Sequence, residues 1–344
     1  MLTQLMAKFN LINLKNLFDW LAFTNFYFLS YNLISSLINK YKYTTTAPLI
    51  MDNGYTGSIN INKSVATILT QSKKKDINEF LGFYLAGLIE GDGYISITNE
   101  NRVILGITFN LKDQPLAEKL LNFLGKGFIA KRKSNCIELR FSEKKTILKI
   151  VTLINGKFRT PKIDQLHKLI DWLNNKYSMA ISKLPLDNSP LDVNSWLTGF
   201  IEADGGFYIR FSLKQIICKF SLEQRMIYPK TGESYYTLLN NICIFLNVNL
   251  SVRNRLNKKN SYYQIRVENQ NSTKILIDYL NKYPLLSSKY LDFLEWEKSF
   301  RIISKKEHMT EQGKELILAA KNNMNDSRTN FNWSHLNLLE CRLL

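Results

Sequence analysis

Two stretches of the chain repeat one pattern: LAGLIEGDG at residues 85–93 and LTGFIEADG at residues 197–205. Position by position they share an apolar residue, a small residue, Gly, two apolar residues, Glu, a small residue, Asp and Gly. The chain has 344 residues, and the two aspartates lie 112 positions apart (204 − 92). A match of this length indicates an internal duplication, so we expect two structural repeats.

Each copy carries small residues four positions apart, which would form a stripe along one face of a helix. The pairs are Gly87 with Gly91 and Gly199 with Ala203. Two helices approach each other closely through such stripes, because no large side chain separates the backbones. The sequence therefore predicts that the two helices pack directly against each other through these four residues.

Each helix is expected to end at an aspartate, Asp92 or Asp204, followed by Gly93 or Gly205 as a left-handed cap. The C-terminus of a helix carries about half a negative charge from its aligned peptide dipoles. A carboxylate at this end is therefore unfavourable unless something compensates for it.

Packing of the two helices would bring Asp92 and Asp204 together, with Glu90 and Glu202 adding to the negative charge. Like charges placed so close need a cation between them. Hard carboxylate oxygens, without a neighbouring His or Cys, favour Mg2+. We expect Asp92 and Asp204 to be the metal ligands, with Mn2+ able to substitute.

Both segments resemble the motif of the LAGLIDADG homing endonucleases, in the form that carries two copies on one chain. The resemblance runs from about Asn78 to about Arg301. It implies an α+β fold of two pseudo-symmetric αββαββα repeats packed through the two motif helices, each with an antiparallel, saddle-shaped sheet for DNA. It also implies cleavage of both strands across the minor groove at the helix ends, leaving short overhangs.

The composition favours a polyanionic partner. Lys and Arg number 46 against 29 Asp and Glu, a formal net charge of +17 at pH 7. By itself this charge leaves ribosomal proteins, nucleases and membrane-surface proteins open. Four cysteines without CxxC spacing argue against a disulfide framework or a zinc site. Only three histidines are present, which argues against a His-dependent nuclease.

Polar stretches divide the chain into five parts. We expect an N-terminal extension (an apolar leader plus a polar linker, Thr44 to Lys75) over 1–75, a first repeat over 76–182, a linker over 183–194, a second repeat over 195–305 and a tail over 306–344. The apolar stretch at 17–38 is interrupted by Asp19 and by several amides and hydroxyls, which argues against a membrane span.

Periodicity and turn residues predict matching elements in the two repeats. In the first we expect helices at 77–91 and 114–124, strands at 94–98, 103–111, 128–133 and 136–141, and helices to Trp172. In the second we expect helices at 195–203 and 235–246, strands at 206–213, 216–222, 249–256 and 262–268, and helices over 273–303.

Alternation along the strands separates an apolar face from a polar, basic face. The inward side chains are expected to be Ile137, Leu139, Phe141, Ile209, Phe211, Val252, Ile265 and Val267. Arg and Gln read guanine and adenine edges in the major groove, although a merely solvated face is the alternative. We expect DNA contacts from Arg140, Tyr208, Arg210, Arg253, Arg255, Gln264 and Arg266. Basic hairpin tips suit phosphates; these residues are Lys131, Arg132, Lys133, Lys258 and Lys259.

Phosphodiester hydrolysis needs an activated water and neutralisation of charge on the phosphate, which carboxylate-bound metal ions supply. The resemblance further implies a lysine that organises water near the site. Lys289 matches that pattern, and Lys162 is its counterpart. Lys162 precedes Trp172 by ten residues whereas Lys289 precedes Trp296 by seven, which weakens the match. An ordinary surface charge is the alternative for both lysines.

Gln224 corresponds to a family position that holds a water, and the first repeat has Leu111 there. We therefore expect an asymmetric site. The expected catalytic residues are Asp92, Asp204, Lys289, Lys162 and Gln224.

We expect a Mg2+-dependent, site-specific double-strand DNA endonuclease that promotes mobility of its host intron. The alternative is an RNA maturase that assists splicing of a host group I intron, and both activities can coexist. A DNA-binding regulator is disfavoured because neither aspartate is lost, and a membrane-tethered protein rests only on the apolar N-terminal stretch. The expected DNA target is a long pseudo-palindrome bound by a monomer. A composition rich in Asn, Lys, Ile, Leu and Tyr is typical of an AT-rich genome and fits an organelle. We expect the protein to be mitochondrial rather than chloroplast-encoded.

Overall fold

The computed structural model describes residues 61–212, 215–254, 261–337 and 339, with side chains from Asp76 onward. The predicted leader, the apolar stretch at 17–38 and the linker up to residue 60 lie outside these residues. Within the part of the chain that is described, no helix is both long enough and apolar enough to cross a membrane.

The first repeat runs helix, two strands, helix, two strands and two helices. Its elements are α4 (Ile61–Asp92), β1 (Gly93–Ile97), β2 (Val103–Asn110), α5 (Gln114–Leu124), β3 (Phe128–Lys131), β4 (Cys136–Phe141), α6 (Lys144–Ile154) and α7 (Ile163–Tyr177). Helix α4 begins well before the predicted 77, so the linker prediction is wrong over 61–75. That stretch contains neither Gly nor Pro, the two residues that most disfavour a helix.

The second repeat has the same order of elements. They are α8 (Trp196–Asp204), β5 (Gly205–Phe211), β6 (Ile216–Arg225), α9 (Tyr236–Leu246), β7 (Leu250–Asn254), β8 (Ser261–Val267), α10 (Gln270–Lys282) and α11 (Lys289–Ser304). The tail continues as a further helix, α12 (Glu311–Asn322), which packs against α11. Each repeat thus closes with two helices, in the stretches where the sequence predicted helices, although the shorthand αββαββα writes only one.

Each repeat contains one four-stranded antiparallel sheet, in the order β1-β2-β4-β3 and β5-β6-β8-β7. The registers are equivalent, since Gly93 opposes Ile107 as Gly205 opposes Leu222. Ser134 and Asn135 form the turn between β3 and β4, with both residues at positive φ, as a tight hairpin turn requires. The α+β fold with two repeated halves is therefore confirmed.

Most of the side chains predicted to face inward are buried, but Phe211 is only half-buried and one further residue is exposed. Ile137, Leu139 and Phe141 are each at most 1% exposed. Val252, predicted to face inward, is 55% exposed. It lies on β7, an edge strand with a neighbouring strand on one side only. That prediction was wrong because alternation fixes the side of the sheet but not whether anything covers it.

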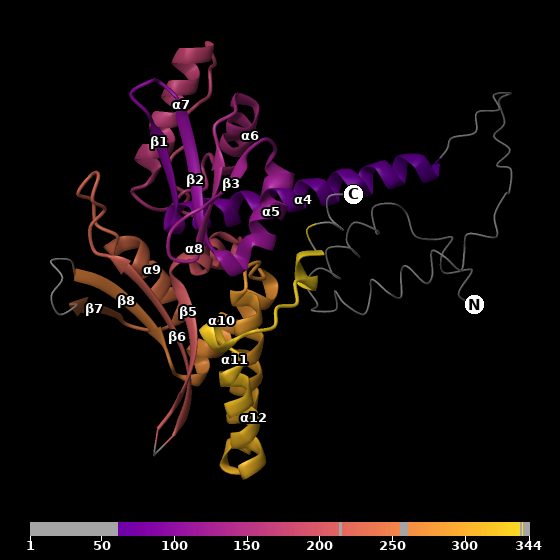
Figure 1. Cartoon of the computed structure of the whole chain (residues 1–344), viewed down its shortest axis with the longest axis vertical. Coiled ribbons are helices and arrows are strands. Elements are labelled where there is room, and N and C mark those ends of the chain that lie inside the picture. The colour runs from indigo at the N-terminus through magenta and orange to yellow at the C-terminus, as the bar shows by residue number, and fades with distance from the viewer. Residues whose placement is uncertain (1–60, 213–214, 255–260, 338, 340–344) are drawn as a thin grey trace, which may run out of the picture. The chain divides into compact units, whose positions relative to one another are not determined.

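Helices α4 and α8 meet between the two sheets (Figure 1) and form the most extensive contact between described elements. A Cβ atom on Gly87 would lie 2.1 Å from the carbonyl oxygen of Trp196, and one on Gly199 would lie 1.9 Å from that of Tyr84. The contact is thus reciprocal, and it leaves no room for a side chain at either glycine. At the next turn a Cβ on Gly91 would meet the Ala203 Cβ at 2.1 Å. The predicted glycine-faced packing is confirmed.

The predicted left-handed caps are wrong. Gly205 is extended, with φ −88° and ψ 155°, and Gly93 is not among the described residues with positive φ. Each helix instead passes directly into a strand. Glycine is needed for close approach, because a Cβ on Gly93 would lie 2.6 Å from the Ile89 Cα.

Candidate active site

The contact between α4 and α8 brings Asp92 and Asp204 to one place. Each is the last residue of its helix, directly after the touching residues Gly91 and Ala203. The Oδ2 atom of Asp204 lies 3.4 Å from the position that a Cβ on Gly91 would occupy. Asp92 is exposed and Asp204 is half-buried, so solvent reaches both. Two carboxylates from different repeats therefore share one open end of the helix pair.

Both aspartates hold protons more tightly than usual. Desolvation by the surrounding protein and the neighbouring charge of Asp92 raise the pKa of Asp204 to about 7. Desolvation also raises the pKa of Asp92, although Lys289 and Lys162 oppose that shift. The pair therefore carries charge that the protein only partly compensates.

Two lysines lie against the ends of the motif helices. Lys162 Nζ donates to the carbonyl oxygens of Ile89 and Gly93, at 3.0 and 2.9 Å. Lys289 Nζ donates in the same way to those of Ile201 and Ala203, both at 3.2 Å. A cation here neutralises the negative end of the helix dipole. This is the compensation that a carboxylate at a helix C-terminus requires.

The structure gives Lys162 and Lys289 equivalent places in the two repeats. Lys162 is the residue immediately before α7 and Lys289 is the first residue of α11. Lys162 is 7% exposed and Lys289 is half-buried, so neither is an ordinary surface charge. Burial lowers the pKa of Lys162 to about 8, against the opposing effect of nearby acids. The different spacing to Trp172 and Trp296 reflects the helices that follow, not the position of the lysine.

Glu90 and Glu202 do not join the aspartates, contrary to the prediction. The Glu90 carboxylate accepts from the backbone N–H groups of Arg159 and Thr160, at 2.9 and 2.5 Å. Glu202 accepts from the backbone of Ser287 at 2.9 Å. Both are buried, and desolvation raises the pKa of Glu90 to about 7. Each glutamate thus fixes the loop that leads into its own lysine.

The same glutamates also bridge the repeats. Trp196 Nε1 donates to Glu90 at 2.5 Å, and the Tyr84 hydroxyl donates to Glu202 at 3.3 Å. Tyr84 and Trp196 occupy equivalent positions, one residue before each nine-residue motif. These reciprocal bonds hold the two helix ends in register.

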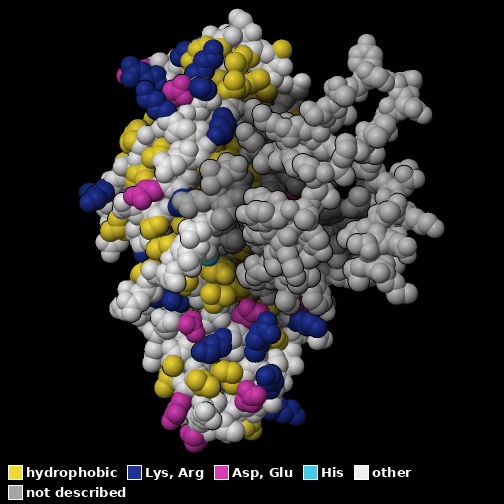
Figure 2. Space-filling model, turned by 90° about the vertical axis from the view of Figure 1, so that its right-hand side faces the viewer, with side chains coloured by type: hydrophobic (Ala, Val, Ile, Leu, Met, Phe, Trp, Pro, Cys, Tyr) yellow, Lys and Arg dark blue, Asp and Glu magenta, His cyan; other side chains and the backbone are white. Residues whose placement is uncertain are grey.

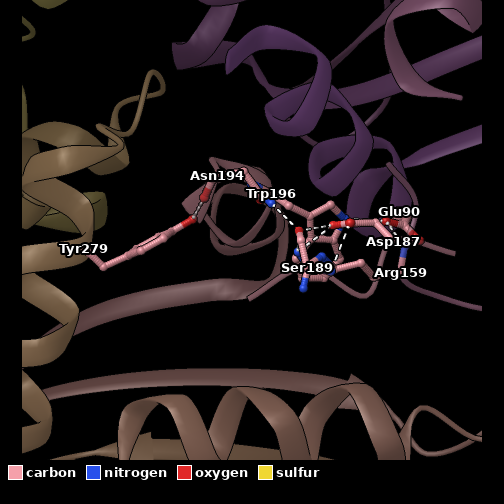
Figure 3. Close-up of polar contacts among 7 residues, drawn as sticks. All are labelled: Glu90, Arg159, Asp187, Ser189, Asn194, Trp196 and Tyr279. Atoms are coloured by element: carbon pink, nitrogen blue, oxygen red, sulfur yellow. Dashed lines mark hydrogen bonds and ion pairs between the residues drawn. The ribbon is translucent and has the colours of Figure 1, made fainter. Parts of the chain in front are cut away.

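A buried network ties the lysine loop of the first repeat to the segment 183–194, which was predicted as a linker (Figure 3). The Arg159 side chain pairs with Asp187 at 2.5 Å and donates to Ser189 Oγ at 2.9 Å. Asn194 donates to the same Ser189 oxygen, and its carbonyl oxygen accepts from the Tyr279 hydroxyl, both at 2.9 Å. This segment therefore does more than connect the two repeats: its side chains also hold the lysine loop of the first repeat in place.

Gln224 lies on the Asp204 side of the site, where its Nε2 donates to Asp204 Oδ2 at 3.0 Å. It belongs to strand β6, which extends to Arg225. The sheet registers make Phe109 the equivalent residue, two positions after Ile107 as Gln224 is two positions after Leu222. The prediction of Leu111 was therefore wrong, because a single-chain pattern cannot fix strand register. The asymmetry remains, with an amide on one side and a phenyl ring on the other.

A cavity of about 290 Å³ adjoins the Asp92 side of the site. Asp113, Asp292 and Asn325 line it together with Asp92 and Lys289. The tail, to which the sequence assigned no role, contributes Asn325, whose backbone N–H donates to Asp292 Oδ1 at 3.0 Å. Nothing in the local sequence of the tail indicated this, because the contact spans more than thirty positions of the chain.

The residues predicted to contact DNA lie on the sheets, apart from the tips. Tyr208, Arg210, Arg253 and Arg266 are exposed, Arg140 is half-buried and Gln264 is buried at 3% exposure. Lys131, Arg132 and Lys133 are exposed around the turn between β3 and β4. Arg255, Lys258 and Lys259 lie outside the described residues. On the side drawn in Figure 2, acidic and basic side chains are interspersed over the lower part, without one dominant basic patch there.

The donor set at the helix ends suits a hard divalent cation. No cluster of three or more His, Cys, Asp or Glu fit to hold a metal occurs among the described residues. Mg2+ is commonly bound by only one or two carboxylates, with substrate phosphates and water completing its shell. Asp92 and Asp204 therefore fit Mg2+ better than a metal that needs an all-protein cage.

Comparison with known proteins agrees with this geometry. The family profile described as LAGLIDADG endonuclease matches residues 85–173 and 197–300. The intron-encoded DNA endonuclease aI3 of Saccharomyces cerevisiae is 32% identical over 299 residues, covering 74% of this chain and 72% of its own. An uncharacterised cox1 intron-2 protein of Schizosaccharomyces pombe is 33% identical over 261 residues, covering 73% and 75%. The intron-encoded RNA maturase bI4 of S. cerevisiae is 32% identical over 141 residues, 41% of this chain and 21% of its own.

Solved structures show the same fold. The LAGLIDADG homing endonuclease I-GzeII, in complex with its DNA target, superposes with a TM-score of 0.59 at 19% identity, covering 72% of this chain and 99% of its own. I-SmaMI, bound to uncleaved DNA in the presence of calcium ions, gives 0.53 at 21% identity, covering 71% and 98%. With the duplicated motif, the matched profile and these relatives, the chain belongs to the LAGLIDADG endonuclease family.

Proposed function

We propose that the protein is a site-specific endodeoxyribonuclease that cuts both strands of a long pseudo-palindromic duplex with Mg2+, or Mn2+ in its place. The observation that carries this proposal is the convergence of Asp92 and Asp204, one from each repeat, at the open end of the helix pair. Each repeat places a sheet beside that end, which matches a duplex whose two halves are related by pseudo-symmetry. We infer that a monomer suffices, because both acids come from one chain.

The proposed roles follow from the contacts. Asp92 and Asp204 would hold the metal, which when bound would activate a water and neutralise charge on the phosphate. Lys162 and Lys289, fixed against the helix ends, would keep positive charge beside both acids. Gln224 would orient Asp204 and a water on one side. Tyr208, Arg210 and Arg266 would face DNA bases, and Lys131 and Lys133 its phosphates.

We infer that this activity serves the mobility of a host intron in a mitochondrial genome. The support comes from relatives that are intron-encoded endonucleases and from one that derives from a cox1 intron. A chloroplast origin is less well supported, since neither of these relatives points to it.

An RNA maturase is the second candidate. The similarity to the maturase bI4 supports it, although that match covers only 41% of this chain. Splicing of the host group I intron RNA in vitro, with and without the purified protein, separates the two activities. A protein that accelerates splicing but leaves the joined exon DNA intact is a maturase only.

The test of the nuclease uses the full chain and a duplex that spans the joined exons of the host intron. Replacing either acid, Asp92→Asn or Asp204→Asn, removes a metal ligand that supplies several kcal/mol to the transition state, so cleavage should fall by at least about a hundredfold. Binding of the uncleaved duplex should be retained. The control is Asp171→Asn on α7, the same substitution at a residue that is distant in sequence from both acids. This variant should cleave the duplex normally. Cleavage at the wild-type rate by either variant would refute the assignment.

A further inference from the structure

The outer face of the first sheet holds a carboxylate that is almost withdrawn from solvent. The Glu138 side chain is 4% exposed. Its oxygens accept from the Tyr94 hydroxyl and from the Arg132 guanidinium, and Arg140 Nε lies 3.0 Å from Oε1. All four residues lie on one face, since Tyr94 and Arg140 both oppose Gly106 on β2. One glutamate thus holds two arginines on the face proposed for DNA.

The second sheet carries a related cluster. The Glu223 side chain is 16% exposed, and it accepts from Arg253 and from Gln264 Nε2, the latter at 2.7 Å. Gln264 Oε1 in turn accepts from Arg266 Nε at 2.6 Å. Glu223 and Gln264 are directly opposite in the register of β6 and β8. Here too one glutamate orients the polar and basic side chains around it.

The registers relate the two clusters position by position. Leu139 and Ile265 are equivalent, because they oppose the equivalent residues Ile107 and Leu222. Glu138 therefore corresponds to Gln264, and Arg140 to Arg266. Glu223 corresponds to Thr108. The carboxylate thus lies on β4 in the first repeat and on β6, the equivalent of β2, in the second, so each sheet has one carboxylate at a different strand.

A carboxylate on a face that binds DNA reduces affinity, because the phosphates repel it. Because both sheets nevertheless have such a carboxylate, we expect it to contribute something other than DNA affinity. Arginine recognises a base edge through a rigid planar fork, and a partner that fixes the fork reduces the entropy lost on binding. An arginine without such a partner is free to turn toward the nearest phosphate, which carries no sequence information.

We propose that Glu138 and Glu223 are positioning residues that aim Arg132 with Arg140, and Arg253 with Arg266, the latter held through buried Gln264, at base edges, and so set base discrimination in the two half-sites. This rests on the proposed DNA endonuclease function. Each glutamate acts on its own half-site, because each cluster lies within one sheet. Loss of either carboxylate frees arginines for phosphates, so DNA affinity rises in general while discrimination falls.

The test exploits the natural difference between the repeats. Glu138→Gln introduces the residue that the second repeat has at the equivalent position, so its size and shape suit the site. Glu118→Gln on α5, where exposed Glu118 accepts from Gln114 Nε2 at 2.7 Å, is the matched loss of charge away from the sheet. The probe is a duplex selected by the wild type from a randomised library, together with all single base-pair variants of both halves.

For Glu138→Gln we expect preference at one or more positions of the first half-site to fall by about tenfold, the size of one bidentate base contact. Preferences in the second half-site stay unchanged. The slope of log affinity against log salt steepens by about one, as one more phosphate is contacted. Glu223→Gln should give the reciprocal result, with relaxation confined to the second half-site.

A uniform change in affinity, with wild-type base preferences in both halves, would overturn the proposal. Thermal unfolding checks that each variant is folded. If Glu138→Gln does not fold, Arg140→Gln tests the same cluster and should relax the same half-site with weaker binding. If the wild type selects no duplex at all, the proposed endonuclease function fails. If the wild type selects a duplex but the variants keep the wild-type base preferences, only the positioning role of the two glutamates fails.

Discussion

The Asp92 end and the Asp204 end of the site share one framework and differ in what touches the acid. In both, a buried glutamate fixes a loop and the lysine of that loop donates to the carbonyl oxygens of the motif helix. Only Asp204 accepts from an amide, that of Gln224, because Phe109 stands at the equivalent place. Duplication preserved the parts that place the carboxylates, whereas the groups around the carboxylates have diverged.

The largest expected effect concerns the shared framework. Gly87→Ala and Gly199→Ala each force a methyl group to within about 2 Å of a carbonyl oxygen. Such overpacking against backbone should cost about 3 kcal/mol of unfolding free energy. Chemical denaturation measures it. Similar losses for the two variants would support the reciprocity of the contact.

Gly232→Ala provides the contrast for those variants. It has positive φ but no atom within 4 Å of the added Cβ. Its cost should be limited to backbone strain of about 1 kcal/mol. Equal losses at Gly232 and Gly199 would contradict a steric role for the interface glycines.

A second prediction concerns the group that differs. Gln224→Leu makes the Asp204 end apolar, like the Asp92 end, and removes the only described hydrogen bond to its carboxylate. Cleavage of one strand should slow by about tenfold, the effect of losing one hydrogen bond to a charged group. With a supercoiled plasmid target, nicked circles should accumulate ahead of linear product.

Phe109→Leu is the matched control for that variant, since it changes volume but leaves both ends as unlike as before. It should leave the ratio of nicked to linear product unchanged. Slowing of both strands to the same extent by Gln224→Leu would show that the two ends do not act separately.

The smallest effect is on stability as pH changes. The pKa of Asp204 is raised to about 7 in the folded protein, whereas an Asp side chain in the unfolded chain has a pKa of about 4. Between these two pH values the folded state therefore keeps a proton on Asp204 that the unfolded state has released. Stability from this group is therefore present at low pH and lost as pH rises to about 7. Without divalent ions, Asp204→Asn should melt above the wild type at about pH 8, and the difference should shrink toward about pH 5.

Asp171→Asn serves as the reference for the pH series, because Asp171 is an exposed partner of Lys183. It should follow the wild type at both pH values. A wild-type protein whose melting temperature relative to Asp204→Asn does not depend on pH would contradict the raised pKa.

Much of the fold and of the site was predictable because the signals are local. The helix of the motif, the bounds of α5 and β4, and the small-residue stripe depend on periodicity within a few residues. Lys289 could be found from its short motif. Apart from the linker predicted over 61–75, which is helical, the predictions that were wrong depend on what neighbours an element in space. They concern the glycine caps, the place of Glu90 and Glu202, Leu111 and Val252.

By itself, the sequence determined that two glycine-faced helices, each ending in an aspartate, would pack against each other and be followed by strands, since the spacing of side chains along a helix or strand is fixed by backbone geometry. The two antiparallel sheets around them were implied by the family resemblance. Only the tertiary structure decided that Lys162 and Lys289 neutralise the helix ends, that Phe109 opposes Gln224, and that Glu138 and Glu223 hold arginines on the sheets. These contacts join residues that are far apart in the chain. Strand register and burial bring such residues together, and a local sequence pattern specifies neither.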